Sequence, residues 1–233
     1  MSAAGPGIGP NGRRTGRPIA EAVSARRRAQ MVGSLRTLAR APAATPGNRG
    51  PAEEACDLCG VGIPAQHRHL LHLVERRIVC SCEPCWAMRA GEGDYRPTGN
   101  RTVWLPGLKI PDDLWAAFQI PIGLAFFMRS TVTECVVAMY PSPAGATESE
   151  LHFQAWQRMC ECNPVLTGLE SDIEGLIVNR LSDPPVYAIA PIDQCYALTG
   201  AIKATWEGIS GGAGVQPAVT DFFAGLQERA VPA

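Results

Sequence analysis

Five of the nine cysteines lie in one short stretch of the sequence, and their spacing is suited to binding a metal ion. Cys56 and Cys59 form one Cys-x-x-Cys pair, which Gly60 follows, and Cys82 and Cys85 form a second pair. Two intervening residues let both thiolates of a pair reach one ion from a tight turn, and a glycine after the pair permits a positive φ. The pairs are 22 residues apart, slightly more than is usual for a four-cysteine zinc site. We therefore predict one ion per chain, bound by these four cysteines.

Zinc is the expected ion and iron is the alternative, because both accept a tetrahedral set of thiolates. Iron would make the segment similar to rubredoxin and able to transfer one electron. In rubredoxins a glycine follows each pair; Gly60 fits this pattern, whereas Trp86 occupies the position after the second pair. The bulk of Trp86 disfavours a second set of N–H···S bonds, so the sequence favours zinc.

The stretch "CSCEPC" contains a third cysteine, Cys80, two residues before Cys82 and on the same face of an extended chain. We expect Cys80 to be a spare thiol, with a substitute ligand or a redox-sensitive neighbour as the alternatives. His67 and His69 should share one face of a strand, and His72 should point to the other. Because four thiolates complete a tetrahedral site, we expect these histidines to be surface groups or to support the ligands, with metal binding by one of them as the alternative.

Two short strands are needed to bring the cysteine pairs together. "HRHLLHL" and "RIVC" have the composition of strands, and "VERR" between them predicts the turn of a hairpin. This hairpin would return the second pair to the first. Residues 53–90 are therefore predicted to form a zinc-ribbon-like four-cysteine module.

The rest of the chain, residues 91–233, is predicted to be an α+β domain with a mainly antiparallel sheet and flanking helices, since strands and helices do not alternate strictly. Predicted strands are "RTVWLPG" (101–107), "IPIGLAFFM" (120–128), "ECVVAMY" (134–140), "IEGLIV" and "PVYAIAPI", of which the second and third should form a hairpin. Predicted helices cover 193–206 and 215–230, with a short helical turn at Pro164.

A further helix is predicted to begin within "ATESELHFQAWQRMCEC", with Thr147 as its N-cap and Glu150 completing a capping box. The preceding "YPSPAG" would then be a loop that leads into a helix N-terminus. Such a terminus can hold an anion, but a plain strand-to-helix connection is the simpler interpretation. We interpret Cys135, Cys160, Cys162 and Cys195 as small buried hydrophobic residues.

The formal charge of −1 hides a division of the chain into a basic leader and an acidic remainder. Residues 1–50 contain nine arginines and one glutamate, a net charge of +8, and the remainder contains 12 basic and 21 acidic residues, a net charge of −9. Residues 1–18 are predicted to be disordered, and residues 19–52 to form a basic helix and a linker. The helix is expected to dock on an acidic surface, with nucleic-acid or membrane binding as the alternative.

No stretch is apolar for long enough to span a membrane, and no apolar segment of a secretion signal follows the arginines. Five clustered cysteines without such a signal are typical of metal binding in a reducing compartment. We therefore expect a cytoplasmic protein without a transmembrane segment.

Several motifs carry a resemblance to a known family: the cysteine module, followed by "QIPIGLAFF", "MYPSPAGATESEL", "NPVLTGLE" and "APIDQCYALTGAIKATWEGISGG". Together they resemble an uncharacterised bacterial family, a domain of unknown function, whose members are typically encoded beside nickel–iron hydrogenase genes. The resemblance covers about residues 52–230. It implies that the matching Cys56, Cys59, Cys82 and Cys85 are metal-binding residues, and it implies no catalytic residue, because the family has no established activity.

The resemblance favours a non-catalytic accessory protein with a structural zinc site, acting in the assembly, maturation or attachment of a nickel–iron hydrogenase. Its expected partners are hydrogenase subunits or maturation factors. The alternative is a rubredoxin-like iron electron carrier for the same system. A nucleic-acid-binding zinc ribbon is a third candidate, but the acidic body disfavours it because phosphate contacts need clustered positive charge. No Ser/His/Asp arrangement that would indicate an enzyme is visible.

Overall fold

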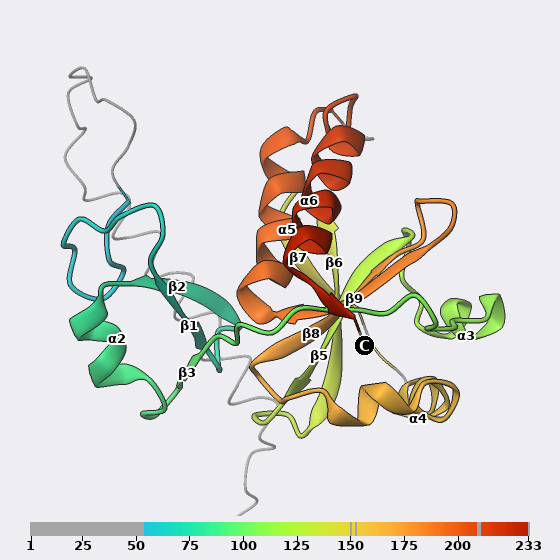
Figure 1. The fold of residues 1–233 in the computed structure, drawn as a ribbon, viewed down its shortest axis with the longest axis horizontal. Helices are drawn as coiled ribbons and strands as arrows, with labels where there is room; N and C mark the ends of the chain where they lie inside the picture. The colour runs from blue at the N-terminus through green and yellow to red at the C-terminus, as the bar shows by residue number, and fades with distance from the viewer. Residues whose placement is uncertain (1–53, 150, 152, 209–210, 233) are drawn as a thin grey trace, which may run out of the picture. The chain divides into compact units, whose positions relative to one another are not determined.

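The computed structural model describes residues 54–149, 151, 153–208 and 211–232. The predicted disordered leader (1–18) and the predicted basic helix and linker (19–52) lie outside these residues. The described residues form an α+β fold with two sheets, in which every strand pair but one is antiparallel (Figure 1). The predicted fold class is confirmed.

The smaller sheet contains the hairpin that was predicted between the cysteine pairs. Its three strands have the order β2-β1-β3, with bounds β1 Arg68–His72, β2 Arg77–Ser81 and β3 Tyr95–Pro97. A helix, α2 (Glu83–Arg89), follows β2 directly. Neither α2 nor β3 was anticipated, and β3 extends this sheet beyond residue 90, where the predicted module ends.

The larger sheet has seven strands in the order β10-β4-β9-β8-β5-β6-β7. The strands are β4 Val103–Trp104, β5 Leu124–Ser130, β6 Cys135–Ser142, β7 Gly145–Ser149, β8 Glu174–Asn179, β9 Val186–Pro191 and β10 Val231–Pro232. β5 and β6 form the predicted hairpin, in which Phe126 lies opposite Met139. The predicted strands "IEGLIV" and "PVYAIAPI" also form, as β8 and β9, with ends within a few residues of those expected.

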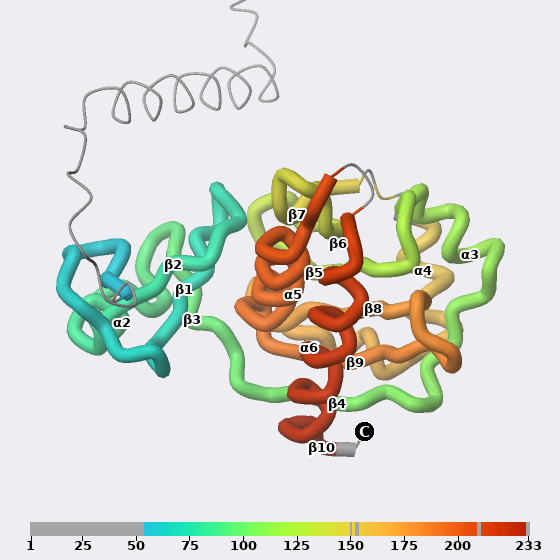
Figure 2. Tube along the Cα trace, turned by 90° about the horizontal axis from the view of Figure 1, so that it is seen from above, coloured from blue at the N-terminus to red at the C-terminus, as the bar shows by residue number. Residues whose placement is uncertain are grey.

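Helices cover both faces of the larger sheet, which explains why its central strands are apolar on both sides. They are α3 Asp112–Ala117, α4 Phe153–Cys162, the 3-10 helix η1 Pro164–Gly168, α5 Ile192–Thr205 and α6 Val215–Arg229. α5 and α6 run side by side, and both views show this pairing (Figures 1 and 2). Among the described residues, no helix combines the length and the apolar character needed to cross a bilayer.

Two hydrophobic cores result, one on each face of the larger sheet. The side chains of Phe126 and Phe127 illustrate the division, because successive residues of a strand point to opposite faces. Phe127 packs with α3, α4 and η1, whereas Phe126 packs with α5 and α6. Leu71 of β1 and Leu73 belong to the second core, so the smaller sheet is packed against the same helices.

The helix predicted from Thr147 does not begin there. Residues Gly145–Ser149 form β7, which pairs with β6 in a hairpin. Only Pro143 and Ala144 of the predicted "YPSPAG" loop form its turn, because the other four residues belong to the two strands. The Thr147 hydroxyl donates a hydrogen bond to the Ser142 hydroxyl (2.8 Å) and caps no helix. Helix α4 begins later, at Phe153, and Glu150 lies outside the described residues. The loop therefore leads into a strand, and the idea of an anion at a helix N-terminus is wrong.

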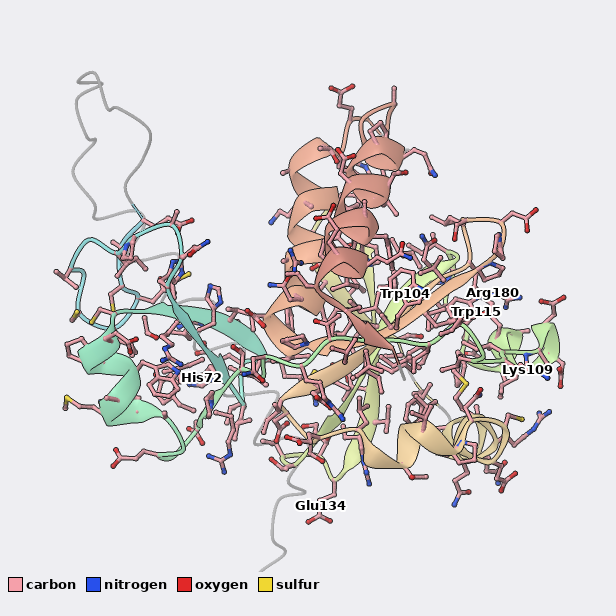
Figure 3. The ribbon with its side chains drawn as sticks, in the orientation of Figure 1. His72, Trp104, Lys109, Trp115, Glu134 and Arg180 are labelled. Atoms are coloured by element: carbon pink, nitrogen blue, oxygen red, sulfur yellow. The ribbon has the colours of Figure 1, made fainter. Side chains whose placement is uncertain are left out.

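Arg180 connects α3 to the β8–β9 hairpin. Its guanidinium forms an ion pair with Asp112 and lies over the ring of Trp115, 5.3 Å from the ring centroid. Figure 3 shows Arg180 and Trp115 next to each other at this end of the sheet. A delocalised guanidinium can form the ion pair and the ring contact at once, which a lysine could not do as well.

An ion pair between a half-exposed arginine and a buried glutamate connects β8 to the segment before β4. Arg101 donates two hydrogen bonds of 2.7 Å to Glu174, one to each carboxylate oxygen, and the Glu174 side chain is only 3% exposed. This pairing raises the pKa of Arg101, although burial acts in the opposite direction. The bidentate geometry makes Arg101 the main counter-charge of a carboxylate that water does not reach.

Arg101→Ala should lower the free energy of unfolding by about 2–3 kcal/mol, because it leaves a buried carboxylate without its counter-charge. This loss is smaller than the largest values found when one partner of a buried ion pair is removed, because the Arg101 side chain is half-exposed and water can replace part of its interaction with Glu174. Arg158→Ala is the matched control: Arg158 pairs with Asp113 at 2.9 Å, but both side chains are exposed, so no measurable change is expected. Urea denaturation of the two variants checks this; equal effects would contradict the assignment.

Candidate metal centre

The first cysteine pair lies in a tight turn before β1. The N–H of Gly60 donates to the carbonyl of Cys56 (2.8 Å), and Gly60 has the predicted positive φ, 77°. The N–H of Cys56 donates to the carbonyl of Val61 (2.8 Å), which closes the loop. Cys56 is 2% exposed and Cys59 is exposed, so the ion would be covered on one side only.

Asp57, between the two cysteines of the first pair, attaches this turn to β2. Its N–H donates to the carbonyl of Cys80 (2.9 Å), and its carboxylate accepts the N–H of Cys80 (2.8 Å). These two bonds fix the first pair beside the end of the strand that precedes the second pair. Asp57 therefore positions the site, a role that the cysteine spacing alone did not reveal.

The second pair begins a helix, whereas the sequence analysis predicted only a tight turn. Cys82 is the N-cap of α2, Pro84 lies in its first turn, and the N–H of Trp86 donates to the carbonyl of Cys82 (2.9 Å). Proline is well tolerated in the first turn, since no helical N–H bond is lost there. The Trp86 ring packs under the guanidinium of Arg68, which lies 4.5 Å from the ring centroid.

The four predicted ligands converge. The sulfur atoms of Cys56, Cys59, Cys82 and Cys85 all lie within 4.8 Å of one another, and those of Cys59 and Cys82 are 3.7 Å apart. A regular tetrahedron of sulfurs, each about 2.3 Å from a zinc ion, has edges of about 3.8 Å. A disulfide would need about 2.0 Å. The cluster therefore has the dimensions of a site that could hold one metal ion.

The pKa values of the clustered thiols diverge, as expected for like groups competing for charge. Burial raises the pKa of Cys56, but hydrogen bonds from the backbone N–H groups of Cys82, Leu58 and Cys59 outweigh it, and the pKa falls to about 6. The side chains of Cys82 and Cys59 raise the pKa of Cys85 to about 12. Without a cation, therefore, the cluster resists ionisation of all four thiols, and a bound ion would remove this restriction.

Three further residues that the sequence analysis singled out also converge. His69 lies directly opposite Cys80 in the β1–β2 pairing, and the rings of His67 and His69 are in edge contact, with centroids 4.6 Å apart. His67, His69 and Cys80 each place one ligand atom within 4.8 Å of the other two. As predicted, His72 points elsewhere; it packs against Tyr95, with ring centroids 5.0 Å apart, and Figure 3 shows it on the smaller sheet.

The remaining cysteines are less uniform than predicted. Cys195 is buried and Cys160 is half-buried, but Cys135 and Cys162 are exposed. The prediction that all four are buried is thus wrong for Cys135, at the start of β6, and for Cys162, the last residue of α4. Within the described residues, none of the four belongs to a group of side chains able to hold a metal ion.

Comparison with known proteins gives one match. No curated protein and no solved structure matches the chain. Residues 55–230 match the model of a family of unknown function, DUF5947. The match runs from just before the first cysteine pair to the end of α6 and includes all four clustered cysteines. The chain therefore belongs to this family of unknown function.

Proposed function

We propose that the chain is a non-catalytic accessory protein in which Cys56, Cys59, Cys82 and Cys85 bind a structural zinc ion. The observation that carries this proposal is the convergence of four sulfur atoms at the spacing of a tetrahedral zinc site. Zinc with four thiolates has no open coordination position, so it organises the fold and does not activate water. The function of such a module lies on its surface.

The surroundings of the second pair support zinc in preference to iron. The Cys56 sulfur accepts the backbone N–H groups of Leu58 and Cys59 in its own turn and that of Cys82, whereas the N–H of Trp86 is used by the first turn of α2. A rubredoxin-like site would need similar N–H···S bonds around both pairs, because these bonds tune the reduction potential. The two pairs here differ, which suits an ion without redox chemistry.

The purified full-length chain should contain one tightly held zinc ion and should be colourless. Elemental analysis and a visible absorption spectrum of the same sample check both points, since zinc thiolate does not absorb visible light and ferric thiolate does. Stoichiometric iron, with a visible band that a reductant bleaches reversibly, would support the electron carrier instead. A sample without either metal would contradict the proposal as a whole.

For the partner, we propose a hydrogenase subunit or maturation factor, in the reducing cytoplasm. The hydrogenase link rests on the sequence resemblance; a protein partner is supported by the surface of the module. Val61, beside the first cysteine pair, is 52% exposed, and Met88 of α2 is 69% exposed. Exposed apolar side chains on a small metal-stabilised module are suited to contact with another protein.

In a native host, affinity purification of the chain should recover hydrogenase subunits or maturation factors, and deletion of the gene should lower hydrogen uptake without loss of the hydrogenase transcript. Met88→Asp should keep the zinc and the fold but reduce recovery of the partner, because it places a charge in the apolar contact. Val132→Asp, at an exposed valine of the β5–β6 turn, is the matched control and should behave as wild type. Normal hydrogen uptake in the deletion strain, with no hydrogenase component recovered, would contradict the proposed partner.

A further inference from the structure

A second group of metal-binding side chains lies beside the four-thiolate cluster and is made of His67, His69 and Cys80. The hairpin register places the last two together, since His69 pairs with Cys80 across β1 and β2. His67, just before β1, reaches the same place through its ring contact with His69. Three potential ligands from two strands and the preceding loop thus converge without any contribution from the four clustered cysteines.

Both imidazole rings are held through one nitrogen, which leaves the other nitrogen available. Nδ1 of His67 lies 2.9 Å from the carbonyl oxygen of Pro64, and Nδ1 of His69 lies 2.9 Å from Oδ2 of Asp193 on α5. Next to these acceptors Nδ1 carries the proton, so each Nε2 keeps its lone pair. Histidines that bind metal ions are usually oriented in this way, by a carbonyl or a carboxylate on the second nitrogen.

The atoms left over at this cluster lack partners. Among the described residues, three buried side-chain nitrogen or oxygen atoms have no hydrogen-bond partner, and two of them are Nε2 of His67 and Oδ1 of Asp193. The His67 side chain is only 6% exposed, so water does not readily compensate its nitrogen. An unpartnered buried polar atom costs about 1–3 kcal/mol. Coordination of a cation by Nε2 would remove this cost for His67.

Negative charge and open space also meet here. Oε2 of Glu54 lies 3.3 Å from Nδ1 of His67, and the carboxylate of Asp57 accepts the N–H of Cys80. The one basic side chain that borders the same space, Arg68, is paired with Glu83 at 3.1 Å. The space is an open cavity of about 390 Å³, whose lining includes His67, His69, Asp193, Trp86, Thr98 and Asn100.

We propose that His67, His69 and Cys80 bind a second zinc ion, separate from the ion of the four-thiolate cluster. Two imidazole nitrogens and one thiolate are a ligand set that zinc accepts, and three protein ligands leave the fourth position open. His67 and His69 line the cavity, so water or a small ligand from the cavity could occupy that position. Cys80 is then a ligand and no longer a spare thiol, and Asp193 positions His69 from the body of the protein.

Zinc titration of the purified full-length chain, with its tightly held ion in place, tests this proposal. After removal of unbound metal, elemental analysis should find two zinc ions per wild-type chain. Cys80→Ser and His69→Ala should each retain one ion, because the four-thiolate site remains. His72→Ala, which removes a histidine of the same strand on the opposite face, should retain two.

A second measurement does not depend on whether the variants fold. In the wild-type chain, added zinc should protect Cys80 from alkylation, as read by mass spectrometry, and a mild chelator that leaves the four-thiolate ion bound should restore the reaction. Cobalt added to the same wild-type preparation should give a sulfur-to-cobalt charge-transfer band.

One ion at zinc saturation, Cys80 equally reactive with and without zinc, or the same loss in His72→Ala as in His69→Ala would each overturn the second site. None of these results would affect the four-thiolate site, which Cys82→Ser tests independently.

Discussion

Cys82→Ser should release the proposed zinc ion of the four-cysteine cluster and unfold the cysteine module, whereas Cys80→Ser should retain both that ion and the fold. The two residues lie two positions apart on the same stretch of chain, so the substitutions are closely matched. Only Cys82 contributes a sulfur to the four-thiolate cluster, where it lies 3.7 Å from that of Cys59. Three remaining thiolates leave the tetrahedron incomplete.

The expected effect is large because the module has little core of its own. Its fully buried side chains are few: Leu70 and Val79 lie opposite each other on β1 and β2, while Leu71 and Leu73 pack against α5 and α6. Structural zinc supplies roughly 10–16 kcal/mol of apparent free energy in small zinc modules. A core of this size provides only a few kcal/mol, so losing most of the contribution of the zinc should unfold the module.

Zinc content after gel filtration measures the loss of the ion. Hydrogen exchange followed by mass spectrometry measures the unfolding of the module. In Cys82→Ser, peptides from residues 54–97 should exchange rapidly, while peptides from β5 and β8 should remain protected. A strong chelator should produce the same pattern in the wild-type chain. Cys135→Ser controls for the loss of an exposed thiol. If Cys80→Ser loses the tightly held ion as readily as Cys82→Ser, the wrong pair has been assigned to the cluster.

The four-thiolate cluster was predictable because its information is local. Each Cys-x-x-Cys pair specifies its own turn, and only one predicted hairpin had to be right for the pairs to meet. The convergence of His67, His69 and Cys80 can also be derived from the sequence. A four-residue turn after His72 sets His72 opposite Arg77, and counting back along both strands puts His69 opposite Cys80. The alternation of faces alone does not show this pairing, because it depends on the register between the strands.

Elements whose form depends on distant partners were predicted less well. Thr147 and Glu150 have the spacing of a capping box, yet Thr147 lies in β7, because β6 offers an unpaired edge that a returning strand can complete. The helix signal in this stretch is genuine but begins later, at Phe153. Asp193 could not be connected to His69 from sequence, since 124 residues separate them and only the packing of β1 against α5 brings them together.

Gly175→Ala should destabilise the fold by about 1–3 kcal/mol, the usual cost of overpacking a close-packed core. A Cβ at Gly175, the second residue of β8, would lie 2.7 Å from the sulfur of Cys195 and 3.3 Å from the carbonyl oxygen of Phe127. Cys195 is fully buried on α5, and the carbonyl belongs to the neighbouring strand β5, so neither atom can move aside easily. Gly200→Ala is the control: its Cβ meets nothing within 4 Å on helix α5, so a gain of up to about 1 kcal/mol is expected.

The double variant Gly175→Ala/Cys195→Ala identifies the cause. Cys195→Ala alone removes a buried sulfur and leaves a small void, so it should also be destabilising. In the double variant the new methyl group moves into the space of the missing sulfur, and the total loss should be smaller than the sum of the two single losses by about 0.5–3 kcal/mol. Urea denaturation of the four proteins measures this coupling. Additive losses would show that the clash with Phe127, and not the contact with Cys195, makes glycine necessary where β8 passes beneath α5.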